Sequence, residues 1–275
     1  MSERSEVISS LAITSLQQSI NFSFFCCFKN LFLKHKFIIQ NSNLQQMDAL
    51  KIDSDEWKNL ENVLEEMIPH YDNINSRMTF GMDKKWRKIL INESCNKEVA
   101  VEIGSGPGTL AMMLKSEKIF CVDPSAQMHK IARERLKQAK ISPEKFEFIT
   151  APAEKIPVSN NVADFVCCAF AFRDFYDKKK ALTEIYRILK NNGKFMILDI
   201  AKHNNIYGTL IYNYIKHIAP VITGSDAPKM LAKTYNAFGT PEYYADIMKE
   251  TGFKNVQIRF LNFRTIFVLS AEKRI

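Results

Sequence analysis

A glycine-rich turn directly after an apolar segment is the feature that most constrains how this chain can fold. In Glu102-Ile-Gly104-Ser-Gly106-Pro-Gly108, three of the nine glycines fall within five residues. Glycine adopts positive φ angles without strain and allows a ligand to approach the backbone closely. In a doubly wound sheet such a turn lies beyond the carboxyl end of a strand, where ligands bind. The turn therefore predicts an open α/β sheet with a binding site at its carboxyl edge.

Short apolar segments alternate with helical patterns along most of the chain. The pattern predicts strands over 98–103, 119–123, 146–149, 164–170 and 194–199, and helices over 53–67, 82–94, 109–116, 126–139 and 178–189. The last of these helices is expected to stop at Asn191-Asn192-Gly193, and a helix over 241–250 precedes strands over 255–261 and 265–271. Near-continuous apolar strands separated by helices indicate a buried, mostly parallel sheet. We expect a Rossmann-like seven-stranded sheet with a C-terminal antiparallel hairpin and helices on both faces.

The first 47 residues differ in composition from the rest of the chain. They contain no glycine or proline and show no clean helical or strand period. We expect a poorly ordered extension over 1–47, cap helices over 48–97 and a ligand-binding domain over 98–275. A transit peptide, a membrane-surface anchor and true initiation at Met47 are the alternatives for the extension.

Composition excludes several classes of protein. With 46% hydrophobic and 25% charged residues, the chain is neither disordered nor a disulfide-stapled miniprotein. No stretch reaches the 18 or so apolar residues that cross a bilayer. The six cysteines form no C-x-x-C spacing, which indicates buried thiols in a reducing cytoplasm and no metal site. The net charge of +8 comes from dispersed lysines, so we expect no nucleic-acid partner.

The spacing of the turn indicates which ligand it holds. A dinucleotide fingerprint needs glycine three residues after Gly106, where this chain has Thr109. The open turn can accommodate a ligand without a pyrophosphate, such as S-adenosylmethionine. Asp123 ends the next strand, 19 residues beyond Gly104, and its carboxylate is placed to accept both ribose hydroxyls. Met128 then packs either on the adenine ring or in the core.

These motifs together resemble the class I S-adenosylmethionine-dependent methyltransferases over residues 98–200. The segment from Tyr71-Asp72 to Trp86-Arg87 resembles the N-terminal motif of the UbiE-type family, whose members C-methylate the ring of ubiquinone and menaquinone precursors. Phe170-Ala-Phe-Arg173-Asp174 resembles that family's F-G-(L/I)-R-N segment, and 187–199 resembles its second motif. The similarity covers about residues 65–258. At Pro152 this chain lacks the side chain with which the family binds the adenine amino group.

The resemblance implies a role for each group of residues. The expected cofactor-binding residues are Glu102, Gly104, Ser105, Gly106, Pro107, Gly108, Asp123, Pro124, Met128, Pro152, Ala153, Ala169, Tyr71 and Arg87. Arg173 and Asp174 are the expected catalytic residues, with an exposed Arg–Asp pair as the alternative. Tyr71, Asn75 and Arg87 are expected to close the N-terminal helices over the cofactor. Residues 201–240 are expected to form a substrate lid that carries Tyr207, Tyr212 and Tyr235.

The sequence thus predicts an enzyme that methylates the ring of a lipoquinone precursor with S-adenosylmethionine. A methyltransferase for another lipid or small metabolite, a nucleic-acid methyltransferase, and a non-catalytic S-adenosylmethionine-binding protein remain as alternatives. The expected partner is a small lipophilic acceptor. The expected location is the cytoplasm, with peripheral membrane association and a homodimer as options.

Overall fold

The computed structural model describes residues 70–275, and the expectations for residues 1–69 lie outside this part of the chain. Within it, seven strands form one sheet in the order β3-β2-β1-β4-β5-β7-β6. The strands are β1 Val99–Ile103, β2 Lys118–Asp123, β3 Phe146–Thr150, β4 Ala163–Ala169, β5 Leu189–Ile200, β6 Lys254–Leu261 and β7 Ile266–Glu272. Neighbours among β1 to β5 pair in parallel, whereas β7 is antiparallel to both β5 and β6. The predicted architecture, including its C-terminal hairpin, is confirmed.

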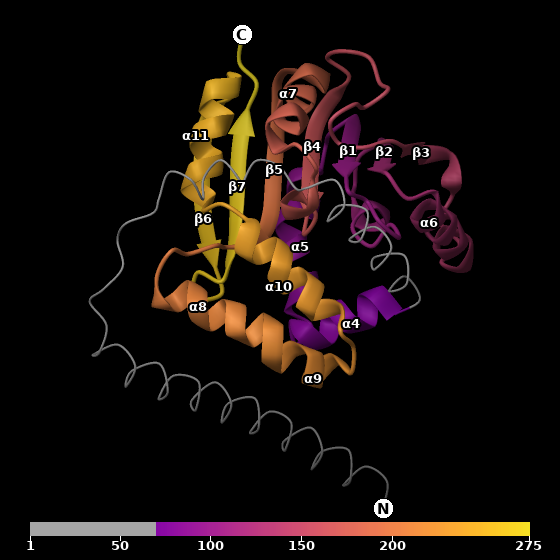
Figure 1. Ribbon diagram of the computed structural model, residues 1–275. Coiled ribbons are helices and arrows are strands. Elements are labelled where there is room, and N and C mark those ends of the chain that lie inside the picture. Colours follow the sequence, from indigo (N-terminus) through magenta and orange to yellow (C-terminus); the bar gives the residue numbers. More distant parts are fainter. Residues whose placement is uncertain (1–69) are drawn as a thin grey trace, which may run out of the picture. The chain divides into compact units, whose positions relative to one another are not determined.

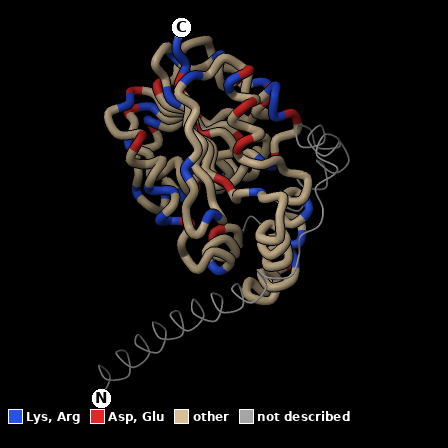
Figure 2. Tube along the Cα trace, turned by 90° about the vertical axis from the view of Figure 1, so that its left-hand side faces the viewer, with Lys and Arg blue, Asp and Glu red and all other residues tan. Residues whose placement is uncertain are grey.

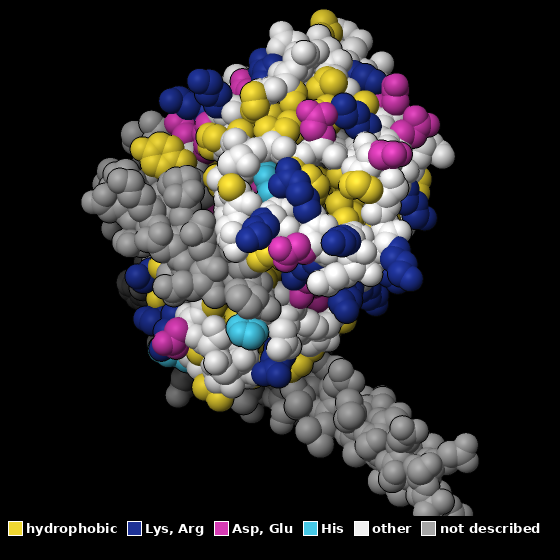
Figure 3. Space-filling model, turned by 90° about the vertical axis from the view of Figure 1, so that its right-hand side faces the viewer, with side chains coloured by type: hydrophobic (Ala, Val, Ile, Leu, Met, Phe, Trp, Pro, Cys, Tyr) yellow, Lys and Arg dark blue, Asp and Glu magenta, His cyan; other side chains and the backbone are white. Residues whose placement is uncertain are grey.

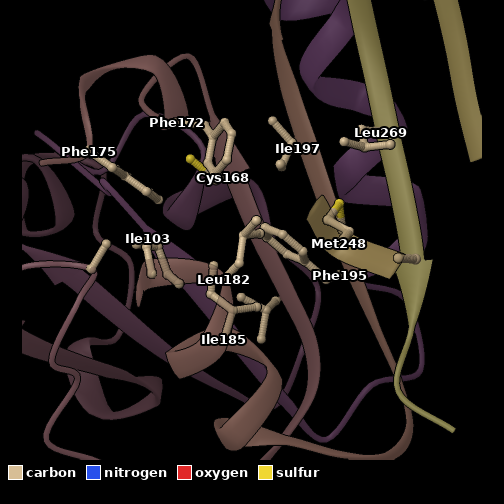
Figure 4. Close-up of a cluster of buried hydrophobic side chains, with 14 of the residues drawn as sticks. Ile103, Cys168, Phe172, Phe175, Leu182, Ile185, Phe195, Ile197, Met248 and Leu269 are labelled. Atoms are coloured by element: carbon tan, nitrogen blue, oxygen red, sulfur yellow. The ribbon is translucent and has the colours of Figure 1, made fainter. Parts of the chain in front are cut away.

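Helices cover both faces of this sheet (Figure 1). They are α5 Met82–Glu93, α6 Ala126–Gln138, α7 Lys178–Ile188 and α11 Pro241–Thr251, whereas α4 Tyr71–Met78 lies beyond the strand ends beside the helices that follow β5. The strand side chains alternate between two cores: Cys167 packs with α5 on one face, and Cys168 packs with α7 and α11 on the other. Figure 4 shows the second core, in which Phe172 and Phe175 reach in beside Leu182 and Ile185 of α7. Because both faces are covered there, the central strands β1 and β4 are buried along nearly their whole length, whereas the edge strand β6 alternates with exposed positions.

The expected lid is a helical segment that follows β5. It consists of α8 Ile206–Asn213, the π-helical turn η5 Tyr214–Ile218, α9 Ala219–Thr223 and α10 Ala227–Ala237. Ile211, Ile215, Ala232 and Tyr235 form a separate small core within it. In Figure 1, β7 points away from this segment and the parallel strands point toward it, so the lid lies beyond their carboxyl ends.

Two local predictions are wrong. The helix expected over 109–116 is only the short 3₁₀ turn η2 Ala111–Met113. Beyond it the chain is extended, because Ser94 binds it: Lys115 N–H donates to Ser94 Oγ and Ser116 Oγ donates to the Ser94 carbonyl. The expected helix stop at 191–193 lies inside β5 instead, where Asn192 takes a positive φ of 63° and donates its N–H to the Lys273 carbonyl.

Candidate active site

The glycine-rich turn is fixed to the carboxyl end of β2. The N–H groups of Gly104 and Ser105 both donate to the Val122 carbonyl, at 2.8 and 3.0 Å. Gly104 has φ +68°, and a Cβ built on it would lie 2.4 Å from the Ala171 Cβ. Gly106 has φ +50°, yet a Cβ there would meet nothing within 4 Å. Gly104 is therefore needed for packing, whereas Gly106 borders open space that a ligand can use.

Asp123 lies beside this open part of the turn. Its Oδ2 accepts the Gly106 N–H at 2.8 Å, and its Oδ1 accepts the Ser125 N–H at 3.0 Å. Burial raises the pKa of this carboxyl group, and the two N–H donors counteract part of that effect. A carboxylate has about four acceptor sites, so each oxygen keeps one for another donor. Two ribose hydroxyls match these remaining sites.

Glu102 and Arg87 are buried polar side chains near the turn, and Arg87 Nε lies 3.9 Å from Oδ2 of the buried Asp83. Their exposed fractions are 2% and 3%, and neither Glu102 Oε2 nor Arg87 Nε has a hydrogen-bond partner among residues 70–275. Burial raises the pKa of Glu102 to about 8, although the Arg87 charge opposes the shift. The Arg87 guanidinium also lies 5.0 Å from the centroid of the Phe170 ring. Unpartnered buried polar atoms are costly, and a zwitterionic ligand end would satisfy both side chains.

Helix α4 is attached to the turn by its first residues. Arg135 of α6 pairs with Asp72 at 2.6 Å, and Thr109 Oγ1 donates to the other Asp72 oxygen at 2.7 Å. Tyr71 lies near both Arg87 and the catalytic candidates Arg173 and Asp174, and Asn75 hydrogen-bonds to its hydroxyl. Burial raises the pKa of Tyr71. Tyr71 and Arg87, predicted from sequence, are thus brought together between the turn and the lid side of the site.

The residues expected around adenine lie at the ends of adjacent strands. Met128 is 4% exposed on α6, which begins behind Ser125, and Ala153 is 6% exposed after β3. Pro124 and Pro152 are exposed, and Ala169 ends β4. The register of the sheet places the segments after β2 and β3 side by side, because Asp123 of β2 pairs with Thr150 of β3, whereas β1 separates β4 from β2. Their roles in binding stay predictions.

Arg173 and Asp174 lie in the 3₁₀ turn η4 Phe172–Asp174 that follows β4. The neighbouring rings of Phe172 and Phe175, with centroids 5.3 Å apart, anchor this turn in the core (Figure 4). Arg173 Nη1 donates to Asp199 Oδ1 at 2.7 Å, and Arg173 Nη2 lies 3.3 Å from Asp174 Oδ2. The Arg173 and Asp174 side chains are only 11% and 14% exposed, so the pair is not a surface ion pair.

Asp174 is the less satisfied of the two carboxyl groups beside Arg173. Its Oδ1 is buried and has no hydrogen-bond partner among the described residues. Burial raises the pKa of Asp174, whereas the Arg173 charge and a hydrogen bond from the Thr234 side chain lower it. Asp199 is fully buried but accepts the N–H groups of Ile200 and Arg173 as well as the guanidinium. Asp174 Oδ1 is therefore the acceptor in this cluster that remains for a substrate.

The lid tyrosines predicted from sequence occupy different environments. Tyr235 is fully buried, and its hydroxyl donates to the Ala201 carbonyl at 3.3 Å. The Tyr207 hydroxyl donates to the Phe263 carbonyl in the β6–β7 turn. The Tyr212 ring is half-buried with the Lys216 ammonium 5.3 Å from its centroid. The Tyr207 contact attaches the lid segment to the β6–β7 turn, whereas the Tyr235 and Tyr212 contacts lie within residues 201–240.

Sequence reasoning missed three residues of this region. Asp199 holds Arg173, Lys178 is buried near the cluster, and the Tyr214 hydroxyl donates to the Met78 carbonyl of α4 at 2.7 Å. A signal existed for Asp199, because it follows a predicted strand whose carboxyl end lies at the same edge as the turn. No local pattern separates Lys178 from its exposed neighbours Lys179 and Lys180.

Comparisons with known proteins agree on one family. The model of the ubiE/COQ5 methyltransferase family matches residues 51–271. A demethylmenaquinone methyltransferase of Thermotoga maritima is 31% identical over 197 residues, covering 67% of this chain and 83% of that protein. The ubiquinone/menaquinone biosynthesis C-methyltransferase UbiE of Rickettsia bellii is 30% identical over 238 residues, covering 81% and 96%.

Solved structures share the fold at lower identity. A SAM-dependent methyltransferase of Thermotoga maritima, titled a possible histamine N-methyltransferase, has a TM-score of 0.57 and 21% identity, covering 78% of this chain and all of that one. The phosphoethanolamine N-methyltransferase 2 of Haemonchus contortus, solved with S-adenosyl-L-methionine, has a TM-score of 0.52 and 14% identity, covering 70% and 53%.

Proposed function

Because the chain belongs to the UbiE/COQ5 methyltransferase family and is an S-adenosylmethionine-dependent methyltransferase, we propose that its acceptor is the ring of a lipoquinone precursor. Relatives at 30 and 31% identity carry names that specify this acceptor class. The observation that carries the proposal is the buried Arg173–Asp174 pair at the carboxyl edge of the sheet, below an apolar lid. A phenolic ring fits such a site, because it is apolar except for its oxygen atoms.

The residues around the turn fit the cofactor. Asp123 would accept the ribose hydroxyls, and Glu102, Arg87 and Ser105 would bind the charged amino-acid end, since each has an unpartnered buried atom or a free acceptor site. Pro124, Met128, Pro152, Ala153 and Ala169 would surround the adenine, with the Ala153 N–H in place of the side-chain contact that Pro152 cannot make. When bound, S-adenosylmethionine supplies an electrophilic methyl group. Tyr71 and α4 would close the site over it.

Arg173 and Asp174 would prepare the acceptor. The Arg173 guanidinium would polarise a ring oxygen or a water molecule bound to it, and Asp174 Oδ1 would orient that group. Loss of the hydroxyl proton makes the ortho carbon nucleophilic, and a positioned acid–base group contributes roughly 10²–10⁴-fold to such a step. The lid would exclude water and hold the ring in line with the methyl group, which can account for about 7–11 kcal/mol of the barrier.

The surface of the lid supports contact with a membrane that contains the acceptor. Val221 and Ile218 are 82% and 46% exposed, beside the exposed Lys216 and His217. Residues 200–225 contain no aspartate or glutamate. Exposed aliphatic and basic side chains without acidic ones suit an anionic lipid surface. No helix within residues 70–275 is long and apolar enough to cross a bilayer. We propose a cytoplasmic enzyme that touches the membrane peripherally through this surface.

Charge elsewhere does not favour a nucleic-acid substrate. Basic and acidic positions are interspersed along the chain (Figure 2). The face toward β3 and α6 likewise shows lysine and arginine side chains mixed with acidic and apolar ones (Figure 3). Nucleic-acid-binding proteins gather their basic residues in one patch or stripe. The alternative of a nucleic-acid methyltransferase therefore has no support in the arrangement of charges seen in these views.

The test is methyl transfer from labelled S-adenosylmethionine by the full chain. Three acceptors are compared in detergent micelles: a demethylmenaquinol, phosphatidylethanolamine and total RNA. Label on a ring carbon of the quinol, identified by mass spectrometry, is the expected result. Label in the phospholipid or RNA would reject the quinone assignment. Tight cofactor binding by calorimetry with no labelled product from these or from a cell lipid extract would favour a non-catalytic binding protein.

A further inference from the structure

Phe170, which directly follows β4, has a backbone conformation that is unfavourable for an aromatic residue. Its φ is +60°, in the left-handed region that bulky side chains rarely adopt. The next strand holds it there, because the Phe170 N–H donates to the Leu198 carbonyl of β5 at 2.8 Å. Such conformations are costly, and they persist where the surroundings enforce them, often at ligand-binding sites. A strained residue at this place points to a contact that its side chain must make.

The segment that contains Phe170 lies beside the glycine-rich turn. β1 is flanked by β2 on one side and β4 on the other, so the chain leaves β1 and β4 at adjacent points of the carboxyl edge. A Cβ built on Gly104 of the turn would lie 2.4 Å from the Cβ of Ala171, the residue after Phe170. In open α/β sheets ligands bind in the crevice where the strand order reverses, which is between β1 and β4 here. Phe170 is thus at the edge of the cofactor site.

The Phe170 ring is half-buried against the core on the α5 side of the sheet. Its centroid lies 6.2 Å from that of the Trp86 ring, and the Arg87 Cζ lies 5.0 Å from it. A guanidinium within about 6 Å of an aromatic ring is attracted by the negative face of the ring. Phe172, two residues later, packs instead in the core on the α7 side. The left-handed backbone at Phe170 therefore gives Arg87 a ring of its own.

The Arg87 guanidinium is restrained without using its hydrogen-bond donors. The side chain is 4% exposed, and its Nε has no hydrogen-bond partner among residues 70–275. Asp83 Oδ2 lies 3.9 Å from this nitrogen, which exceeds hydrogen-bond length, and Thr79 Oγ1 donates to the other Asp83 oxygen at 3.2 Å. A ring face likewise attracts the cation without accepting a conventional hydrogen bond. Arginine has five N–H donors, so the contact with Phe170 leaves them for a ligand carboxylate.

We propose that Phe170 is a positioning residue for cofactor recognition: its ring holds the Arg87 guanidinium in the orientation that binds the carboxylate of the amino-acid end of S-adenosylmethionine. This inference rests on the proposed function only in assigning Arg87 to that carboxylate. A planar guanidinium pairs with a carboxylate through two parallel hydrogen bonds, so its orientation decides the strength of the pair. Phe170 thereby makes the site selective for ligands that carry the amino-acid end over the same nucleoside without it.

The test compares the binding of two ligands to the full chain by calorimetry. S-adenosylhomocysteine carries the amino-acid end, whereas 5′-methylthioadenosine has the same adenosine and sulfur atom but a methyl group in place of that end. In Phe170→Leu the dissociation constant of S-adenosylhomocysteine should rise about 5- to 30-fold, the loss expected for a buried cation–π contact. The dissociation constant of 5′-methylthioadenosine should not change. Weakening of both ligands by the same factor, or of neither, would overturn the proposal.

Two further substitutions at Phe170 separate the ring from the backbone. Phe170→Tyr keeps the aromatic face and should bind both ligands as the native protein does. Phe170→Asn removes the ring but suits the left-handed backbone, so it should reproduce the selective loss, and it replaces Phe170→Leu if the latter does not fold.

The matched control is Phe148→Leu. It removes a ring of β3 that also has an arginine against it, with the Arg133 Cζ 4.5 Å from the ring centroid. The ratio of the two dissociation constants should stay native in this variant, because Phe148 does not contact Arg87. A ratio that changes as much as in Phe170→Leu would show that the effect is not particular to Phe170, and the proposal would fall.

A double-mutant cycle tests whether Phe170 acts through Arg87. Arg87→Met alone should weaken S-adenosylhomocysteine but not 5′-methylthioadenosine, and adding Phe170→Leu should change the ratio no further. An equal additional loss in the Arg87→Met background would show that the ring acts independently of Arg87, which contradicts the inference. A native ratio in Arg87→Met would reject the assignment of Arg87 to the carboxylate, and the inference with it. None of these measurements uses a methyl acceptor: if no quinol is methylated but the ratio changes as expected, the proposed acceptor fails and the inference about Phe170 stands.

Discussion

Two glycines of the same turn should respond differently to replacement by alanine. Gly104→Ala should mainly lower the stability of the fold, whereas Gly106→Ala should mainly weaken cofactor binding. Both Gly104→Ala and Gly106→Ala place a Cβ on a left-handed backbone, at φ +68° and +50°. This strain costs roughly 1–2 kcal/mol per residue and is common to both variants. The surroundings differ, because the new Cβ lies 2.4 Å from Ala171 Cβ in the first variant and meets nothing within 4 Å in the second.

The difference in surroundings fixes the expected magnitudes. Overpacking typically costs a further 1–3 kcal/mol, so Gly104→Ala should lower the free energy of unfolding by about 2–5 kcal/mol. Gly106→Ala should lower it by only about 1–2 kcal/mol. In the second variant the methyl group enters the open space beside Asp123, so the dissociation constant for S-adenosylhomocysteine should rise at least about tenfold, equivalent to about 1.4 kcal/mol.

Urea unfolding followed by circular dichroism gives the first quantity, and isothermal titration calorimetry gives the second. Both are measured on the full chain at one pH, and the native protein serves as the reference. Equal destabilisation by the two substitutions would show that Ala171 does not restrict Gly104. Native affinity in Gly106→Ala would show that the space beside Gly106 is not the cofactor site.

Three further substitutions test the site. Asp123→Ala should weaken S-adenosylmethionine binding by about 1–3 kcal/mol, or about 5- to 150-fold, because ribose hydroxyls lose their acceptor; an unchanged dissociation constant by calorimetry would reject the ribose assignment. Arg173→Lys replaces the two guanidinium nitrogens that contact Asp174 and Asp199 by one ammonium nitrogen on a shorter side chain, so kcat should fall at least about tenfold while cofactor affinity stays within a few-fold; normal initial rates would remove Arg173 from the mechanism. Burial raises the pKa of Glu102 from 4.5 to about 8, so between these values the native state binds a proton that the unfolded state has lost. The free energy of unfolding should therefore decrease as the pH rises from 4.5 to 8, by up to about 1.4 kcal/mol per pH unit. Glu102→Gln should flatten that dependence in urea unfolding at pH 5.5 and 8.5, and an unaltered slope would assign it to other groups.

Much of the fold could be predicted because its signals are local. Apolar runs such as the one that ends at Ile103, and helix caps such as Ser125 and Asp177, specify their elements within a few residues. The segment from Thr109 to Ser116 could not be predicted, because contacts with Ser94, more than twenty residues earlier, decide its conformation. Local pattern favoured a helix there, and tertiary contacts determined an extended chain.

The candidate site divides in the same way. Gly104, Gly106 and Asp123 could be predicted together because parallel strands bring their carboxyl ends to one edge. Arg173 and Asp174 were predicted from a resemblance, and the structure adds that both are held in a buried cluster. Lys178 could not be identified from sequence, because three consecutive lysines look alike until α7 packs against the sheet. Burial of the first one depends on the helix position relative to β5 and η4.

The charge balance of this cluster bears on whether the protein is a catalyst or only a binding protein. In the resembling motif an asparagine follows the arginine, so Asp174 introduces an additional negative charge. Arg173 compensates this charge directly, since its guanidinium lies 3.3 Å from Asp174 Oδ2 and 2.7 Å from Asp199 Oδ1. A buried carboxylate without compensation would cost several kcal/mol, and a protein that only binds the cofactor could avoid this cost with an apolar residue. A buried and partly unsatisfied charge cluster at the acceptor side of the site therefore argues for chemistry there, and loss of turnover with near-native cofactor affinity in Arg173→Lys is the result that this argument requires.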